Sequence, residues 1–109
     1  KVINTTTQVP VTVIPGAIKI TTPGAYPYTA NPFDGMILVD SSSARTINLP
    51  ASPTQGTPFT IKDNVGSAAT NNITISPAAG NIDGAASLVL NTNYASVDLV
   101  YNGVQWNAK

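Results

Sequence analysis

The segment that decides the fold is Asp98–Lys109, which reads DLVYNGVQWNAK. Its Asn102-Gly103 dipeptide is typical of a two-residue type I′ hairpin turn, because these residues tolerate the positive φ that both central positions require. On the N-terminal side, apolar and polar residues alternate over 96–101 with the period of a half-buried strand. A second alternating stretch follows over 104–107. The sequence therefore predicts a closing β-hairpin.

The single tryptophan of the chain, Trp106, lies just after this turn. It shares a predicted strand face with Val104, whereas Gln105 and Asn107 fall on the other face. A buried tryptophan covers about 150–250 Å² and holds a terminal strand that would otherwise fray. We therefore expect Trp106 to close one end of the core, in preference to the alternative that it stacks on a ligand.

Outward from this hairpin, the rest of the chain also reads as β-structure. Nine prolines and eight glycines interrupt it at short intervals, and β-branched residues fill the gaps. Regular short strands separated by turn residues are typical of a sandwich or barrel. The predicted strands are Gln8–Ile14, Ala17–Thr21, Met36–Asp40, Arg45–Leu49, Phe59–Asp63, Ile73–Ser76, Ser87–Leu90, Ser96–Tyr101 and Val104–Asn107.

Alternation within these strands predicts which side chains face the core. The inward residues are expected in pairs two positions apart: Ile47 and Leu49, Phe59 and Ile61, Ile73 and Ile75. The proline-rich stretch 23–32 is predicted to be a loop, because proline cannot donate to the ladder of a central strand. The small polar stretch 64–72 is predicted to be a long connection.

Charge is scarce: 9% of the residues are charged, against about 25% in a typical domain. Five basic residues balance five aspartates, and glutamate and histidine are absent. Such a neutral surface does not attract nucleic acid, and it lacks the repulsion that keeps copies of a protein apart. We expect a single domain over 1–109 that belongs to a larger assembly. Because the chain starts abruptly in strand-like sequence, we also expect it to be the C-terminal fragment of a longer fibrous protein.

Several classes of chemistry lack the residues they need. Without histidine and cysteine there is no Ser-His-Asp or Cys-His nucleophile system and no zinc-thiolate site. Asp34, Asp63 and Asp83 each precede glycine or asparagine, which is typical of turns. Nothing in the spacing of the five aspartates selects a catalytic pair or a calcium loop. We therefore expect no enzymatic activity, no metal site and no cofactor.

Three residues are candidates for contact with a ligand or receptor. Arg45 is the only arginine, and its guanidinium could hold a carboxylate or phosphate through two hydrogen bonds. The alternative, which we favour, is that it pairs with a nearby aspartate such as Asp40. Tyr26 and Tyr28 lie in the proline-rich loop, where they could stack on sugars or pack at a subunit contact.

Much of the sequence also resembles a known kind of protein module. From about Tyr28 to Asn107 the chain is similar to a module common in bacteriophage tail fibres, spikes and needles. The matching pieces are Tyr28-Thr-Ala, Met36-Ile-Leu-Val-Asp40, Arg45-Thr-Ile-Asn-Leu-Pro50, Gly56 followed by Phe59-Thr-Ile-Lys-Asp63, Asn72-Ile-Thr-Ile-Ser76, Asn81-Ile-Asp-Gly84 and Val97-Asp-Leu-Val-Tyr-Asn-Gly-Val-Gln-Trp106. Within that group, the length, the C-terminal end and the lack of any enzymatic residue resemble the knob of a tail needle from a short-tailed enterobacterial phage.

The resemblance implies a fold and a function. Such knobs are homotrimers with a jelly-roll β-sandwich similar to the domains of the tumour necrosis factor family. The knob caps a coiled-coil needle that plugs the portal channel of the virion and holds the packaged genome in. The needle leaves the tail when DNA is ejected and contacts the host cell envelope. On this reading, apolar residues near the N-terminus line the trimer contact, namely Val9, Val11, Val13, Ile18 and Ile20.

Two other functions remain open. A carbohydrate-binding module attached to an enzyme would be a monomer with a flat row of exposed aromatics. Against it, we expect Phe33, Phe59, Tyr94 and Trp106 to face inward, which would leave few of the seven aromatic residues on the surface. A glycosidase or lyase domain that uses two aspartates ranks last.

Overall fold

The computed structural model describes residues 17–109, which form nine strands and no helix. The strands are β1 (Ile20–Thr21), β2 (Tyr28–Thr29), β3 (Met36–Val39), β4 (Arg45–Asn48), β5 (Pro58–Asp63), β6 (Ile73–Ser76), β7 (Leu88–Leu90), β8 (Ser96–Tyr101) and β9 (Trp106–Ala108). Within this range no helix could cross a membrane. The predicted strand Gln8–Ile14 lies outside the described residues.

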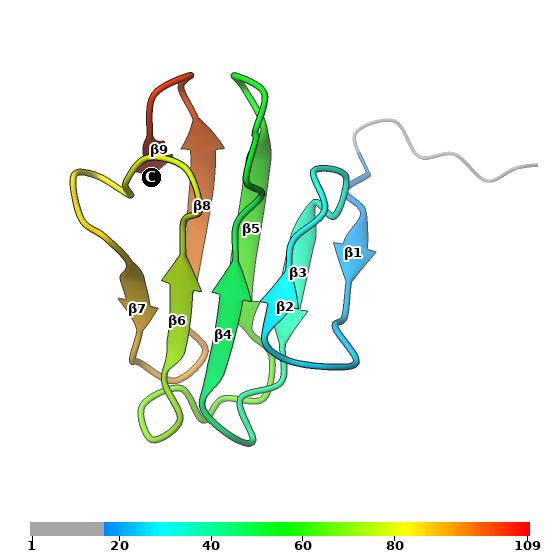
Figure 1. The fold of residues 1–109 in the computed structure, drawn as a ribbon. Helices are drawn as coiled ribbons and strands as arrows, with labels where there is room; N and C mark the ends of the chain where they lie inside the picture. The colour runs from blue at the N-terminus through cyan, green and yellow to red at the C-terminus, as the bar shows by residue number, and fades with distance from the viewer. Residues whose placement is uncertain (1–16) are drawn as a thin grey trace, which may run out of the picture.

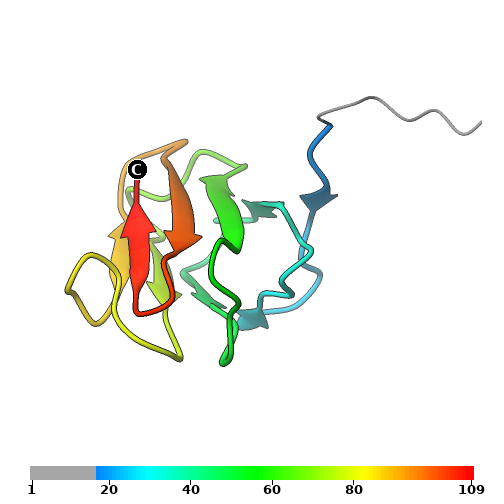
Figure 2. The same ribbon diagram turned by 90° about the horizontal axis from the view of Figure 1, so that it is seen from above.

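The strands form two mixed sheets that face each other (Figures 1 and 2). One sheet has the order β1-β3-β5-β8-β9 and the other the order β2-β4-β6-β7. The all-β sandwich that the sequence predicted is therefore confirmed. The edges are β1 and β9 in the first sheet, and β2 and β7 in the second.

The first six strands wind between the two sheets as a coil. Each successive strand lies in the opposite sheet, and every second strand pairs in parallel, as β3 does with β5 through Met36↔Thr60 and Val39↔Asp63. Parallel neighbours need a crossover connection, which is usually a helix. Here a strand of the other sheet supplies the crossover, so short loops are sufficient.

The last three strands reverse this pattern. β7 pairs antiparallel with β6, β8 with β5, and β9 with β8. The parallel pairs of the coil differ from the antiparallel pairs of a jelly roll. The jelly-roll detail is therefore not confirmed by the pairing of the strands.

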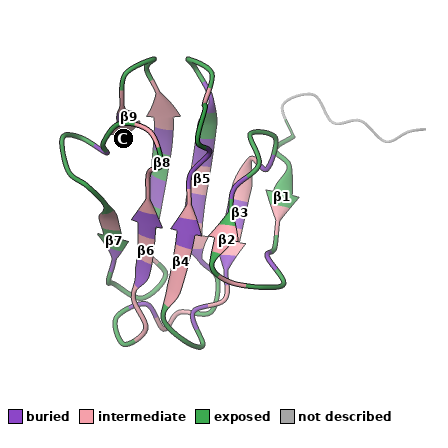
Figure 3. Ribbon diagram, in the orientation of Figure 1, coloured by how far each residue is buried: buried purple, intermediate pink, exposed green. Residues whose placement is uncertain are grey.

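The core lies between the sheets and follows the predicted alternation. All six of the paired inward residues are buried: Ile47, Leu49, Phe59, Ile61, Ile73 and Ile75. Figure 3 shows the buried positions alternating with less buried ones along the strands. Burying a residue of this size contributes about 1.5–3 kcal/mol, so the sandwich rests on these apolar faces.

Trp106 closes one end of this core, as predicted. It is fully buried, and its ring centroid lies 5.6 Å from that of Phe59 and 5.2 Å from that of Tyr101. Its indole Nε1 has no hydrogen-bond partner among the described residues. The side chain thus contributes through apolar and aromatic packing.

The closing hairpin is confirmed, but the prediction that a two-residue turn closes it is wrong. Tyr101 pairs with Trp106, so four residues form the loop, and Gly103 has a positive φ (98°) whereas Asn102 does not. Instead, Asn102 Oδ1 accepts the backbone N–H groups of Val104 and Gln105 at 2.9 Å. An asparagine side chain that satisfies the loop backbone competes with the type I′ turn. Val104 is consequently exposed and does not share the face of Trp106.

Two further expectations need correction. Phe33 and Tyr94, which were predicted to face inward, are 80% and 60% exposed because both lie in connections rather than in alternating strands. The predicted loop 23–32 contains the two-residue strand β2, although β2 is an edge strand as the prolines require. The connection 64–72 is confirmed as turns without a strand.

Candidate functional site

The candidate site lies at the turn between β3 and β4, where Arg45 is held by its own turn. Its Nε donates to the backbone oxygen of Asp40 at 2.7 Å, and its Nη2 lies 3.3 Å from Ser42 Oγ. Nη2 also lies 3.5 Å from Oδ2 of Asp40. The predicted pairing of Arg45 with Asp40 is therefore confirmed.

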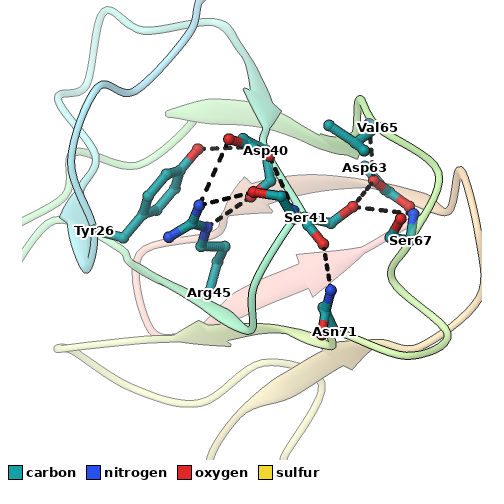
Figure 4. Close-up of polar contacts among 9 residues, drawn as sticks. Tyr26, Asp40, Ser41, Arg45, Asp63, Val65, Ser67 and Asn71 are labelled. Carbon is teal, nitrogen blue, oxygen red and sulfur yellow. Dashed lines mark hydrogen bonds and ion pairs between the residues drawn. The ribbon is translucent and has the colours of Figure 1, made fainter.

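Tyr26 covers this arginine from the loop before β2 (Figure 4). The guanidinium carbon of Arg45 lies 4.4 Å from the centre of the Tyr26 ring, which is the geometry of a cation–π contact. The backbone N–H of Asp40 donates to Tyr26 Oη at 3.0 Å. Two of the three predicted site residues are thus brought together by contacts between two connections.

Beside them is an open surface hollow of about 320 Å³. It is lined by Tyr26, Pro27, Ala44, Arg45, Thr46 and Asn48. Hydrogen bonds from the backbone N–H and the hydroxyl of Ser42, with the Arg45 charge as a smaller cause, lower the pKa of the Asp40 carboxyl. Asp40 therefore stays ionised and balances Arg45, so the hollow suits a small polar molecule better than a free anion.

Tyr28, the third predicted residue, is turned to a different partner. Its hydroxyl donates to Asp34 Oδ2 at 2.6 Å, and the same oxygen accepts the backbone N–H of Asn31 at 2.8 Å. Burial, together with the hydrogen bond to Asp34 and its charge, raises the pKa of Tyr28 to about 12. Tyr28 holds the connection after β2 and does not line the hollow.

The most connected polar residue is Asp63 at the end of β5, which the sequence indicated only as a turn aspartate. It is fully buried. Its Oδ1 accepts Ser41 Oγ at 2.6 Å and the N–H groups of Val65 and Gly66 at 3.1 and 2.9 Å (Figure 4). Its Oδ2 accepts the N–H groups of Ala68 and Tyr94 at 3.0 and 2.9 Å.

These bonds make Asp63 a structural carboxylate. Burial by itself acts to raise its pKa, but the hydrogen bonds from Ser41, Gly66, Tyr94 and Ala68 outweigh it and hold the pKa well below the ordinary value. A carboxylate with every lone pair engaged is neither a base nor a nucleophile. No spacing in the sequence signals this network, because its donors come from three separate connections.

The carboxylates of the other aspartates also accept hydrogen bonds. Asp83 Oδ1 accepts the N–H of Ala108 at 3.1 Å, and Asp98 Oδ1 accepts Thr60 Oγ1 at 2.7 Å. Together with Asp34, Asp40 and Asp63, all five carboxylates of the chain accept hydrogen bonds from its own residues.

No protein-family model matches this chain, and no curated protein matches it. The chemistry of the described residues limits what the site can do. Among them no group of three metal-ligating side chains comes together. The hollow at Arg45 offers an aromatic ring, a guanidinium that is already paired with Asp40, and neutral hydrogen-bonding groups. These can bind a molecule but supply no free base.

Proposed function

We propose that this chain is a non-enzymatic virion component, the trimeric knob at the tip of a phage tail needle or fibre. In this role it contacts the host cell envelope during attachment and genome ejection. The needle, an upstream coiled coil of the same protein, plugs the portal channel of the tail machinery. The resemblance of the sequence to fibre modules motivates the proposal.

The observation that carries the trimer is the apolar edge of the first sheet. Ile18, which lies just before β1, is 67% exposed, and Ile20, in β1 itself, is 59% exposed. Next to them is a hollow of about 140 Å³, lined by Ile18, Gly35, Pro58, Phe59 and Thr60. Exposed apolar side chains that gather at one edge commonly mark a protein contact. Both isoleucines belong to the residues expected at the trimer interface.

The engaged carboxylates support the non-enzymatic part of the proposal. A general acid or base must reach the proton that it transfers. Asp63 is saturated and buried, and the remaining aspartates hold turns or strand neighbours. Each carboxylate thus has a structural role that leaves catalysis without a candidate pair.

The jelly-roll fold similar to tumour necrosis factor domains belongs to this proposal and stays a prediction. The parallel pairs in the coil of the first six strands count against it. The trimer does not depend on this detail, because a cyclic contact requires only a surface that fits its rotated neighbour.

Molar mass in solution tests the proposal. Analytical ultracentrifugation of the chain at micromolar concentration is expected to give three times the mass of one chain, at low and at high salt. Ile20→Ser is expected to lower the measured mass because it weakens the contact between subunits. The matched control is Val104→Ser, which changes an exposed apolar residue in the β8–β9 loop and should leave the mass unchanged. A stable monomer at both salt concentrations would contradict the proposal that the chain is a trimeric knob.

A second candidate is the carbohydrate-binding module attached to an enzyme. The exposure of Phe33 and Tyr94 favours it, because both were expected to be buried and instead present aromatic surface to solvent. A monomer that binds an oligosaccharide would support this module in place of the knob.

A further inference from the structure

Tyr94, in the connection between β7 and β8, is displayed at the surface in a backbone conformation that tyrosine rarely adopts. Its φ is +62°, in the left-handed region that favours glycine and asparagine. The residue is 60% exposed and does not belong to the core. Strained non-glycine residues persist only where the surrounding structure fixes them, and they gather at functional sites.

Three contacts fix Tyr94 in this position. Its backbone N–H donates to the buried carboxylate Oδ2 of Asp63 at 2.9 Å, and its backbone oxygen accepts Lys62 Nζ at 2.6 Å. The hydroxyl end of the ring lies against Gly66, where an added Cβ would stand 2.3 Å from Tyr94 Cζ. The ring is therefore held in place before any ligand arrives, which reduces the entropy lost on binding.

A cation lies beside the ring. Asn93, the residue before Tyr94, is exposed, and its Oδ1 accepts the backbone N–H of Ala69 at 3.0 Å. Lys62 Nζ lies 5.6 Å from the centre of the Tyr94 ring. The Asp63 carboxylate is buried and saturated, so it does not face a ligand.

We infer that Tyr94 is the stacking platform of a glycan-binding site, with a pyranose ring as its ligand. A pyranose has an apolar C–H face and a rim of hydroxyls. The tyrosine ring matches the first, and the Lys62 ammonium, which lies near the ring, can donate hydrogen bonds to the second. Nucleic acid and anionic lipid fit less well, because both require several cations and the whole chain carries only five basic residues.

This site is separate from the hollow at Arg45, and it does not depend on the oligomeric state. A trimer that binds no sugar would overturn this inference and leave the knob standing. A monomer that binds sugar through Tyr94 would support this inference and contradict the trimeric knob.

The test is an array of immobilised hexose and hexosamine oligosaccharides probed with the intact chain, followed by calorimetric titration of the strongest binder. Tyr94→Asn is the decisive variant, because asparagine accepts the positive φ and keeps the loop folded. It is expected to weaken binding at least about tenfold, whereas Tyr94→Phe, which keeps the ring, stays within about threefold. Phe33→Ala, which removes an even more exposed aromatic elsewhere, is expected to bind like the wild type.

Three results would overturn the inference. They are an array without any bound oligosaccharide, wild-type affinity in Tyr94→Asn, and loss of binding in Phe33→Ala. If Tyr94→Asn changed the molar mass of the protein and left sugar binding intact, Tyr94 would be a contact between copies of the chain instead. Unchanged melting temperatures for the variants would show that any loss comes from the site.

Discussion

Asp63 joins three connections that lie far apart in the sequence. Through Ser41 it contacts the turn between β3 and β4, through Gly66 and Ala68 the connection after β5, and through Tyr94 the connection before β8. A buried carboxylate is costly unless it is fully hydrogen-bonded, and here it is. One residue thereby fixes the end of the sandwich that carries both Arg45 and Tyr94.

Asp63→Asn is expected to lower the free energy of unfolding by about 2–4 kcal/mol. The amide group turns one acceptor into a donor, so at least one backbone N–H is left without a partner inside the protein. Chemical denaturation measures the change. Asp98→Asn is the control, since Asp98 is exposed and accepts a single hydroxyl, and it is expected to stay within about 0.5 kcal/mol of the wild type. An Asp63→Asn variant as stable as this control would contradict the structural role.

The stability of the protein is expected to fall on acidification below about pH 4. The pKa of Asp63 is lowered in the folded protein, whereas the pKa of an aspartate in an unfolded chain is about 3.9. Below that pH the unfolded chain binds the proton first, so the contribution of Asp63 is present above this value and is lost as the pH falls. Melting temperatures between pH 7 and pH 2 test this, and Asp63→Asn should flatten the curve. An equally steep curve in that variant would show that other groups are responsible.

At the scale of elements, the β8–β9 hairpin depends on two residues of its loop. Asn102 accepts two backbone N–H groups with its side chain, and Gly103 provides the positive φ. The backbone N–H of Asn102 also donates to the carbonyl oxygen of Gln105 at 3.0 Å. This loop sets the register in which Trp106 faces Tyr101 and enters the core.

Gly103→Val is expected to destabilise the protein by about 1–3 kcal/mol. An added Cβ meets nothing closer than 3.6 Å, so the cost comes from a β-branched residue at φ +98° and not from a clash. Thermal unfolding followed by Trp106 fluorescence measures it. Val104→Thr in the same loop, at an exposed position, should change the melting temperature little. A Gly103→Val protein that melts with the wild type would mean that the loop adopts another conformation.

At the scale of the whole molecule, a chain with little charge presents an apolar edge. The coil of β1–β6 leaves β1 as a two-residue edge strand with Ile18 and Ile20 exposed, while the antiparallel β7–β9 segment completes the other side of both sheets. An edge strand with exposed apolar side chains, in a protein with zero net charge, favours association.

The dissociation constant of the proposed trimer is expected to vary little with salt. Few ion pairs are available to be screened in a chain with 9% charged residues, so raising the salt removes little attraction. Light scattering across a concentration series at low and high salt tests this. Trimers that dissociate markedly at high salt would indicate a contact built on charges such as Lys19, and not on the isoleucines.

The sequence by itself determined most of the strands over residues 17–109, the inward faces of β4, β5 and β6, and the burial of Trp106. Those features follow from local alternation and from turn residues, which act over a few positions. Even there the loop at Asn102 escaped prediction, because a side-chain hydrogen bond competed with the backbone preference of Asn-Gly. The pairing of Arg45 with Asp40 was also predictable, since only five positions separate the two residues.

Only the tertiary structure decided which strands pair and which polar residues meet. The winding between two sheets, the hydrogen bonds from Ser41 and Tyr94 to Asp63, and the packing of Tyr94 on Gly66 all join residues distant in sequence. Local patterns carry no information on such contacts, because they depend on which of many possible sheet arrangements buries the apolar faces best. Tyr94 shows the difference most clearly, since its aromatic ring predicted burial and the connection that holds it placed it in solvent.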